Sequence, residues 1–335
     1  MDIDCGSFAF ELRWGNVSGA YITPRRKLMQ TILGANGQIG EELARYLHNT
    51  VTHDIRLVGR RPSAVNKTDE LFSADLTDAE ATDRAVAGSE IVYLTVGLPM
   101  DSAMWEERFP VMMENTIAAV RNHDAKLVFF DNTYMYPQTA APQVEGKTPF
   151  EPRGRKAAVR ARIATRLQEE MDAGRVEAVI VRAPEFYGPG KTQGLTNTTV
   201  FNRIKKGERP LVPVSADTQR SLIWTPDASR AMGLIGNTPD AYGQTWHLPI
   251  DQDRLTYREM IAIASEVTGR KIRFSTIPLA VFTLAGLFNA PAKEASELMP
   301  RYGVDNIFDT SKFAAHFPEF ETTNYRDGIS QLLSP

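Results

Sequence analysis

The sequence predicts an α/β fold, with a doubly wound parallel sheet followed by a smaller, discontinuous C-terminal lobe. Two observations predict it. From Gln30 onward, short runs rich in β-branched residues alternate with longer helical patterns, which is typical of a parallel sheet covered by helices on both faces. After Pro189 this alternation stops, and loops rich in Thr, Pro and Gly separate helices such as 256–269.

Each element is predicted by its own residues, in chain order. The stretch 30–48 reads as a strand, a glycine turn and a helix. Four more apolar runs predict strands and two periodic stretches predict helices; the strands are 54–60, 90–97, 126–137 and 176–190, and the helices are 110–123 and 151–166. The apolar run 277–288 contains Pro278 and Gly286 and is too short to span a bilayer, so we expect a core helix there.

Composition excludes several classes of function. The formal net charge is −3 and the pI is near 6.0, which argues against a nucleic-acid binder, whose affinity requires a basic field. The single cysteine, Cys5, excludes an internal disulfide and a cysteine-rich zinc site, and it suits a cytoplasmic protein. Residues 1–28 carry acids and lack an apolar h-region, so they are a poor signal peptide and are expected to be an N-terminal extension. We expect no membrane partner.

The stretch "LGANGQIG" carries the strongest functional motif. Gly34, Gly37 and Gly40 form a GxxGxxG pattern between a strand and a helix. Glycine allows the tight turn, the close approach of the backbone to a pyrophosphate and helix–strand packing, while the helix N-terminus supplies N–H donors. The pattern predicts a Rossmann dinucleotide-binding domain in 29–188, with the loop residues Gly34, Asn36, Gly37, Gln38, Ile39 and Gly40 on the cofactor.

The end of the second strand selects between the two nicotinamide cofactors. An NAD site prefers an acid there for the ribose 2′-hydroxyl, whereas arginine pairs with a 2′-phosphate. The sequence "VGRRPS" supplies Arg60 and Arg61 and no acid. This favours NADP over NAD, although a solvated basic loop is the alternative interpretation.

Several motifs in order, GxxGxxG, "GRRP", "ADLTD", "YLTVG", "FYGPG" and "RSLIWTPDASRA", resemble the extended short-chain dehydrogenases/reductases of the NAD-dependent epimerase/dehydratase type. The resemblance runs from about Gln30 to the C-terminus. It implies that 189–335 is mostly a substrate-binding lobe, with 220–247 returning to the Rossmann domain, and that the protein is a homodimer, as relatives often are. It also implies further cofactor contacts from Asp75, Leu76, Thr95, Val96, Gly97, Ala183 and Pro184, and substrate contacts from Tyr187 and Arg220. A surface arginine is the alternative for Arg220.

The catalytic pattern of the family is not intact. Such enzymes carry a Ser or Thr after the fourth strand and a Tyr-x-x-x-Lys on the next helix, in which the lysine lowers the tyrosine pKa. Here the chain reads "DNTYMYP" and then "PFEPRGRKA". Matching the two segments puts Asn132 at the usual serine with Thr133 beside it, Arg153 at the tyrosine and Ala157 at the lysine.

The basic stretch "EPRGRKAAVRARIATR" therefore borders the expected active site. At 100° per residue Arg155, Arg162 and Arg166 share a solvated face, whereas Arg153, Lys156 and Arg160 fall on the apolar side. Since buried cations need partners, we expect Arg153 and Lys156 to line the cleft, with a structural ion pair as the alternative. Such cations clamp an anion or stabilise an oxyanion.

Tyr134 is the candidate proton donor, because strand alternation gives it a different face from Thr133, and Lys156 is the candidate for lowering its pKa. A packed aromatic is the alternative for Tyr134. The sequence thus favours an NADP-dependent oxidoreductase or epimerase-like enzyme with an atypical active site and a small polar, anionic substrate held by Arg153, Lys156 and Arg220. The rival is an inactive NAD(P)-binding sensor, which the missing Tyr-x-x-x-Lys favours. RNA binding is disfavoured because the cations divide between two helix faces.

Overall fold

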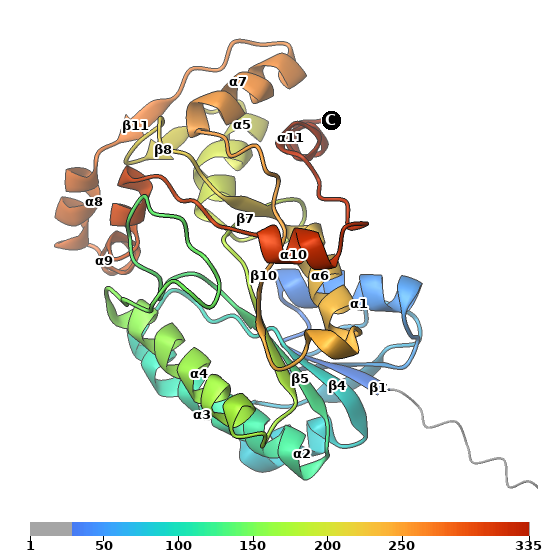
Figure 1. Ribbon diagram of the computed structural model, residues 1–335. Helices are drawn as coiled ribbons and strands as arrows, with labels where there is room; N and C mark the ends of the chain where they lie inside the picture. Colours follow the sequence, from blue (N-terminus) through green and yellow to red (C-terminus); the bar gives the residue numbers. More distant parts are fainter. Residues whose placement is uncertain (1–28, 335) are drawn as a thin grey trace, which may run out of the picture.

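The structure is a computed structural model that describes residues 29–334 (Figure 1), so the predicted extension 1–28, with Cys5, lies outside the described residues. Within 29–334 no helix has the length and apolarity that crossing a membrane requires.

A seven-stranded sheet forms the first lobe. Its order is β10-β6-β5-β4-β1-β2-β3 and every pairing in it is parallel, so the chain winds outward from β1 in both directions. This confirms the predicted fold class. The strands are β1 Met29–Leu33, β2 Ile55–Gly59, β3 Glu70–Ser73, β4 Ser89–Leu94, β5 Lys126–Asp131, β6 Ala178–Arg182 and β10 Thr245–His247.

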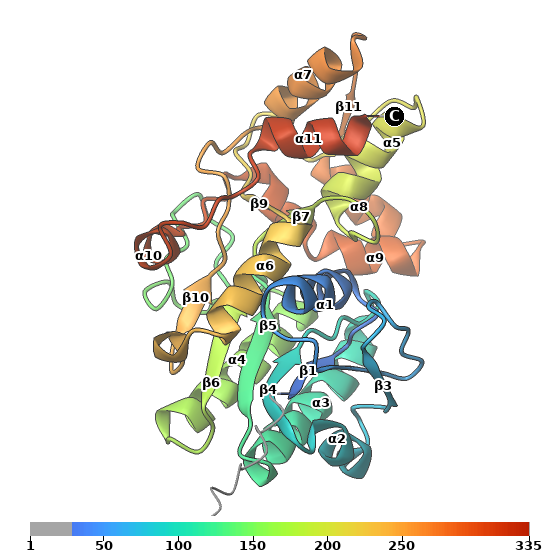
Figure 2. The same ribbon diagram turned by 90° about the vertical axis from the view of Figure 1, so that its right-hand side faces the viewer.

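Helices cover both faces of this sheet (Figure 2). α1 (Gln38–Thr50) and α6 (Thr225–Gly236) pack against each other and share one apolar core with the sheet. The opposite face carries α2 (Ala79–Val86), α3 (Ser102–Asn122) and α4 (Arg155–Asp172), which share a second core. Both cores combine buried strand residues with buried residues of the covering helices, as parallel strands covered on both sides require.

The second lobe is assembled from separate segments around a third apolar core. Two short parallel pairs contribute to it, β7–β9 and β8–β11. Its strands are β7 Glu185–Tyr187, β8 Leu211–Pro213, β9 Leu222–Trp224 and β11 Ser275–Ile277. Its helices and turns are η1 Asn197–Phe201, α5 Asn202–Lys205, α7 Tyr257–Thr268, α8 Leu279–Gly286, α9 Ala290–Ser296, η3 Met299–Gly303 and α11 Tyr325–Leu333.

The chain crosses back to the first lobe between these segments. α6 packs on α1, and after the turn η2 (Pro239–Ala241) β10 joins the edge of the sheet beside β6. The short helix α10 (Ser311–His316) packs against β10. The strands β3 and β10 were not among the predicted strands. β3 has four mostly exposed residues and β10 has three, so neither produces an apolar run.

The apolar run 277–288 is not a core helix, and this expectation was wrong. α8 has no buried residue, and Val281, Leu284 and Phe288 are exposed. Its main contacts are with α9 and η3, and Phe282 packs partly against the third core. Apolar composition alone does not distinguish a core helix from one whose apolar surface stays open.

The second lobe lies over the carboxyl edge of the sheet (Figures 1 and 2). This edge is where the strands of a parallel sheet all end, and ligands of such folds bind there. The loops after β1, β2, β4 and β5, together with the N-termini of α1, α3 and α4, therefore meet the second lobe at one boundary.

Candidate functional site

The glycine loop after β1 has the backbone geometry that its sequence predicts. Gly34 has φ +94°, and a Cβ there would lie 2.8 Å from the Cα and from the N of Val96. A Cβ on Gly40 would lie 2.8 Å from the Cα of Ala35. Only glycine permits the first of these conformations without strain, and the second allows α1 to begin close under the strand.

The N-terminus of α1 is open toward this loop. Its N-cap, Gly37, offers no side-chain hydrogen bond to the first turn, so those N–H groups have no local cap. The segment after β7 reaches this helix, where Lys191 forms an ion pair with Glu41 and the Gln193 N–H donates to Gln38. Uncapped N–H donors with the positive end of the helix dipole form an anion-binding position.

Asn36 joins the glycine loop to the end of β2. Its amide nitrogen donates to the Arg61 carbonyl at 2.6 Å, and its carbonyl oxygen accepts from the Ser63 N–H at 3.2 Å. The Arg60 and Arg61 side chains are exposed beside it. The two cations of the predicted 2′-phosphate position and the glycine loop therefore belong to one hydrogen-bonded unit.

The ends of β3 and β4 complete this side of the site. Hydrogen bonds from Thr77 hold the pKa of Asp75 below its ordinary value, and Arg60 contributes in the same direction. Leu76 is buried and its carbonyl accepts from Asn115. Thr95 is buried and donates to the Leu33 carbonyl at 3.1 Å, which fixes the strand end below the loop.

Val96 and Gly97 occupy different positions in the loop after β4. Val96 backs the glycine loop at Gly34, whereas Gly97 is exposed with no atom within 4 Å of the position of a Cβ. Ala183 and Pro184 are buried directly after β6, and the Ala183 N–H donates to the Asp131 carbonyl at 3.0 Å.

The loop after β5 stands on a buried charge cluster. Asp131 is fully buried and accepts from Arg160 at 2.5 Å and from Arg182 at 3.0 Å. The same carboxylate accepts from the backbone N–H of Asn132 at 2.8 Å, and the side-chain Oδ1 of Asn132 accepts from the Tyr134 N–H at 3.0 Å. This chain of bonds fixes the segment that carries Asn132, Thr133 and Tyr134.

The cluster continues inward through Tyr136. Arg182 donates to the Tyr136 hydroxyl at 2.8 Å, and this hydroxyl lies 2.8 Å from His247 Nε2. Burial lowers the pKa of His247 to about 3, and the nearby Arg182 acts in the same direction, so His247 is neutral at pH 7.

Tyr134 lies at the boundary between the lobes. Its ring stacks on Trp105 of α3 with a centroid distance of 6.1 Å and an interplanar angle of 6°. The guanidinium carbon of Arg301 in η3 lies 4.9 Å from the same centroid. Burial raises the pKa of Tyr134, and Arg301 is the strongest influence in the opposite direction. Arg301 has no acidic partner within salt-bridge distance among residues 29–334.

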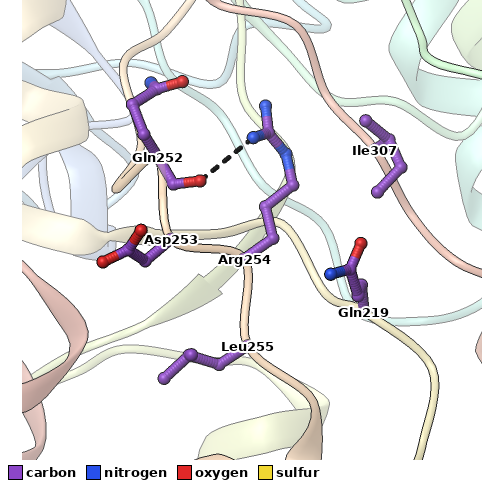
Figure 3. A pocket seen from close by; sticks show the side chains of 6 residues that line it. All are labelled: Gln219, Gln252, Asp253, Arg254, Leu255 and Ile307. Atoms are coloured by element: carbon purple, nitrogen blue, oxygen red, sulfur yellow. Dashed lines mark hydrogen bonds between the residues drawn. The ribbon is translucent and has the colours of Figure 1, made fainter.

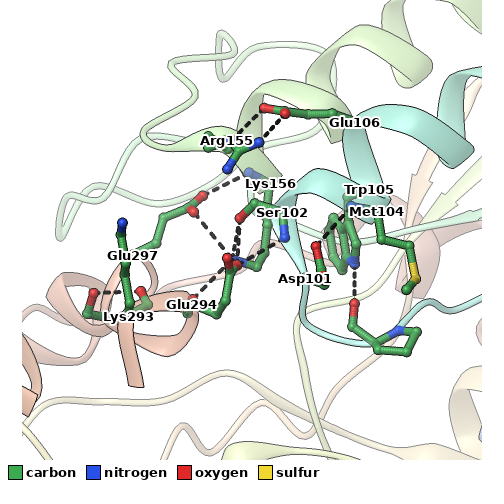
Figure 4. Close-up of polar contacts among 12 residues, drawn as sticks. Asp101, Ser102, Met104, Trp105, Glu106, Arg155, Lys156, Lys293, Glu294 and Glu297 are labelled. Atoms are coloured by element: carbon green, nitrogen blue, oxygen red, sulfur yellow. Dashed lines mark hydrogen bonds and ion pairs between the residues drawn. The ribbon is translucent and has the colours of Figure 1, made fainter. Parts of the chain in front are cut away.

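Lys156 is fully buried at the start of α4 and is held by two glutamates of the second lobe (Figure 4). Its Nζ pairs with Glu294 and lies 3.3 Å from Glu297 Oε2 and 2.9 Å from Ser102 Oγ. These contacts correspond to the structural ion pair that the sequence left as the alternative. They also mean that Arg301, and not Lys156, is the cation that most lowers the pKa of Tyr134.

The two glutamates also cap helices across the lobe boundary (Figure 4). Glu297 accepts from the Lys156 N–H at 2.9 Å, and Glu294 accepts from the Ser102 N–H at 3.1 Å. The N-cap of α4, Gly154, supplies no side-chain bond of its own. Carboxylates are favourable at helix N-termini, because they satisfy free N–H groups and oppose the dipole.

The remaining cations of the basic stretch divide as helix phase predicts, except for Arg153. Arg155 and Arg162 are exposed, and Arg166 is partly exposed. Arg155 pairs with Glu106, and Arg166 pairs with Glu114. Arg153 is also exposed, so its assignment to the apolar side was wrong. It precedes the helix, which begins at Arg155, and the 100° phase does not apply to it.

Two residues predicted to contact substrate are buried in the second lobe. Tyr187 is 1% exposed and stacks on Tyr325 in the third core. Arg220 is 2% exposed; it donates to the Arg301 carbonyl at 3.0 Å, lies over Tyr302, and approaches Glu185 at 3.6 Å. Arg220 is therefore not the surface arginine that the sequence left as the alternative, and its contact with substrate stays a prediction.

The cavity in Figure 3 is not part of the site formed by the loops at the sheet edge. It has a volume of about 500 Å³ and is lined by Gln219, Gln252, Asp253, Arg254, Leu255 and Ile307. These residues all follow Pro189, and none belongs to the glycine loop or to the segment after β5. The candidate site is therefore built on the loops of the sheet edge and not on this cavity.

Comparison with known proteins now decides the family. The family model of the NAD dependent epimerase/dehydratase family matches residues 30–248, more than half of the chain. The chain belongs to this family.

Solved structures of epimerases and dehydratases have the same fold. The UDP-glucose 4-epimerase of Thermus thermophilus, solved with NAD, has a TM-score of 0.71 at 17% identity, and the match covers 91% of this chain and 97% of that one. The UDP-glucuronic acid 4-epimerase of Bacillus cereus, also with NAD, has a TM-score of 0.72 at 12% identity, with 90% and 94% covered. A dTDP-glucose 4,6-dehydratase double mutant of Streptomyces venezuelae has a TM-score of 0.72 at 15% identity, with 91% and 95% covered. At such identities the likeness shows the fold alone.

Among curated proteins, an uncharacterized protein of Sinorhizobium fredii is 30% identical over 122 residues. The match covers 36% of this chain and 33% of that protein, so the chain spans about a third of the length of this relative.

Sequence reasoning missed the second-lobe residues that reach the family's catalytic region. Arg301, Glu294 and Glu297 lie far along the chain from the residues that they contact, and Lys156 is separated from Glu294 by 138 positions. The sequence contains many acids downstream of Lys156, and nothing near Lys156 indicates which of them it contacts. Trp105 was also missed, although an aromatic one turn into a helix at the sheet edge could have been considered.

Proposed function

We propose that this member of the epimerase/dehydratase family binds NADP(H) at the glycine loop and is an atypical oxidoreductase or epimerase-like enzyme. The observation that carries the proposal is the hydrogen-bonded unit formed by the glycine loop, the open N-terminus of α1 and the loop with Arg60 and Arg61. Such a unit offers backbone N–H groups to a pyrophosphate and two guanidinium groups to a 2′-phosphate. NAD in the solved epimerases supports the same cofactor class.

The residues present fit such a cofactor. Gly34 and Gly40 let the loop pack against Val96 and Ala35, where a Cβ would clash, and Gly37 and Asn36 are exposed at the helix N-terminus. Gln38, Ile39, Asp75, Leu76, Thr95, Val96, Gly97, Ala183 and Pro184 complete the proposed cofactor site. Bound NADPH would supply a hydride for reduction of a carbonyl carbon.

The substrate would bind between the lobes near Tyr134. Arg153 is exposed before α4 and has no acidic partner within salt-bridge distance in 29–334, which supports a small polar, anionic substrate. Asn132 and Thr133 adjoin Tyr134 and would orient the carbonyl by hydrogen bonding. Arg220, which donates to the Arg301 carbonyl, would position the Arg301 side chain.

An NAD(P)-binding sensor without turnover is the second candidate. The observation that favours it is the state of Lys156, which is fully buried and paired with two carboxylates, so it offers no free ammonium group to a tyrosine. The family pattern Tyr-x-x-x-Lys falls here on Arg153 and on Ala157, which is 1% exposed.

A turnover assay distinguishes the two candidates. Purified protein with NADPH is challenged with a panel of small carbonyl acids, sugar nucleotides and uncharged carbonyl compounds, and loss of reduced nicotinamide absorbance is followed. The enzyme proposal expects oxidation with at least one anionic substrate and its loss in Tyr134→Phe at unchanged NADPH affinity. Tight NADPH binding without turnover across the panel supports the sensor.

We also propose a cytoplasmic location and a homodimeric assembly. One cysteine in the sequence suits a reducing cytoplasm. Resemblance to the family favours a homodimer, and sedimentation equilibrium would measure this directly.

A further inference from the structure

A tyrosine of the first lobe and an arginine of the second meet at the lobe boundary. The Arg301 guanidinium lies over the Tyr134 ring at 4.9 Å from the centroid, while Trp105 stacks on that ring. Tyr134 packs against the apolar cores of both lobes. The ring is therefore held between the two lobes, and the second lobe places a cation over it.

Arg301 has no ion-pair partner among the described residues, although the carboxylate of Glu185 is near enough to favour its charged form. Its Nε is buried without a hydrogen-bond partner, and no carboxylate in 29–334 lies within ion-pair distance of it. The other cation that acts on Tyr134, Arg160, is paired with Asp131. Arg220 is occupied by Glu185, Tyr302 and the Arg301 carbonyl. An arginine remains protonated under all conditions of interest, so Arg301 favours the tyrosinate form of Tyr134, whereas Glu185 and Glu297 favour the neutral phenol.

Resting on the proposed function, we propose that Tyr134 is the proton donor of the reaction and that Arg301 is its positioning residue. Arg301, a cation of the second lobe, would take the role of the lysine in the family pattern Tyr-x-x-x-Lys. Tyr134 is then catalytic, and Arg301 acts through it.

The step balances as a carbonyl reduction. The nicotinamide of the proposed function would supply a hydride to the carbonyl carbon, so that the C=O π bond breaks and a C–H bond forms. The proton of the Tyr134 hydroxyl moves to the carbonyl oxygen and forms the O–H bond. The substrate is reduced, the nicotinamide is oxidised, and the tyrosinate that remains beside Arg301 takes a proton from water.

The electrostatics of the site agree with this direction of transfer. Burial raises the pKa of Tyr134, so the hydroxyl carries its proton before reaction. Arg301 opposes this rise, and reciprocally Tyr134 opposes the lowering of the Arg301 pKa by burial. A cation stabilises a tyrosinate more strongly in a partly buried position, such as that of Tyr134, than in bulk water.

The test measures ionisation of Tyr134 without depending on turnover. The protein is produced with a fluorinated tyrosine whose intrinsic pKa is lower than that of tyrosine, and ¹⁹F resonances are followed against pH. The chain has 10 tyrosines, and the Tyr134 resonance is assigned by its absence in Tyr134→Phe. Variants are Arg301→Met, Arg301→Lys and the matched control Arg258→Met, since Arg258 lies over Phe274 at 5.4 Å in the same lobe.

The proposal expects the Tyr134 midpoint to rise by about one pH unit in Arg301→Met, a ten-fold gain in proton affinity, because an opposite charge within a few ångströms shifts a pKa by about 1–3 units. Arg301→Lys should retain most of the wild-type midpoint, and Arg258→Met all of it. An unchanged midpoint in Arg301→Met overturns the proposal. If Arg301→Met does not fold, Arg301→Gln makes the same comparison with a neutral polar side chain.

Failure of the proposed function has a different signature. A wild-type protein without turnover on the carbonyl panel contradicts the enzyme, whatever the Tyr134 midpoint does. Where turnover is found, Arg301→Met should lower kcat with little change in NADPH affinity and move the pH profile of kcat upward, whereas Arg301→Lys should restore it. Loss of kcat with an unmoved profile assigns Arg301 a merely structural role and contradicts the proposal.

Discussion

The glycine loop and the N-terminus of α4 lie on the same edge of the sheet and follow the family pattern to very different degrees. At the glycine loop the positive φ of Gly34 and the close approach of Val96 follow directly from the residue type. At α4 the residue that could replace the family lysine, Lys156, is buried against Glu294 and Glu297 instead. A site made by backbone geometry can be predicted from local sequence, and a site made by side-chain partners depends on distant residues.

The largest effect should come from Lys156→Met. Removing this fully buried cation leaves two carboxylates without their partner and should lower the free energy of unfolding by about 2–4 kcal/mol. This is less than for a fully buried pair, because both glutamates are partly exposed. Urea denaturation measures it. Arg155→Met, which breaks the exposed pair with Glu106 next to it, should cost less than about 1 kcal/mol.

If Lys156 is instead a cleft residue, the comparison between the two regions breaks. Lys156→Met would then leave stability unchanged while turnover is lost. The combined variant Lys156→Met with Glu294→Gln and Glu297→Gln sharpens the result, since it should regain part of the stability by removing the unpaired charges.

Gly34→Ala tests the other region. The added Cβ would lie 2.8 Å from the Val96 backbone at a φ of +94°, so we expect a loss of about 1–3 kcal/mol of stability and NADPH binding weakened by more than about ten-fold. Fluorescence titration and thermal unfolding are the measurements. Gly97→Ala is the matched control, because no atom lies within 4 Å of its Cβ position. Equal effects at both positions would contradict the account.

A pH titration tests the buried cluster beneath the loop after β5, which His247 of β10 joins through Tyr136. His247 has a folded pKa of about 3, below its ordinary value, so the unfolded chain binds a proton that the folded chain excludes between about pH 6.5 and 3. The contribution of His247 to the free energy of unfolding is fully present above this window. Within the window it falls by about 1.4 kcal/mol for each pH unit of acidification. His247→Gln should lack this contribution. An identical slope in both proteins would show that His247 is not buried as described.

The smallest effect concerns Arg60 and Arg61. Replacing both by alanine should weaken NADPH binding about ten-fold, roughly 1.4 kcal/mol, because exposed guanidinium–phosphate contacts are screened, and should leave NADH binding unchanged. Arg162→Ala, an exposed arginine on α4, is the control. Parallel losses for the two nucleotides would mean that the pair does not read a 2′-phosphate.

The same contrast explains how much could be predicted from the sequence. The alternating apolar runs predicted five strands of the sheet, whereas β3 and β10 are too short and, in β3, too exposed to produce a pattern. The helix phase placed Arg155 and Lys156 correctly, but it did not apply to Arg153, which precedes the helix. The partners Arg301, Glu294 and Glu297 could not be predicted, because tertiary packing brings them to Tyr134 and Lys156. Composition misled at α8, whose apolar residues are exposed.

The central claim is that the glycine loop and the Arg60–Arg61 loop form a working cofactor site with a preference for the 2′-phosphate. Titration of the wild-type protein with NADPH and NADH, followed by nicotinamide fluorescence, tests it most directly. The account predicts saturable binding of both, with NADPH tighter by about ten-fold or more. Tighter binding of NADH, or no binding of either nucleotide, would contradict it.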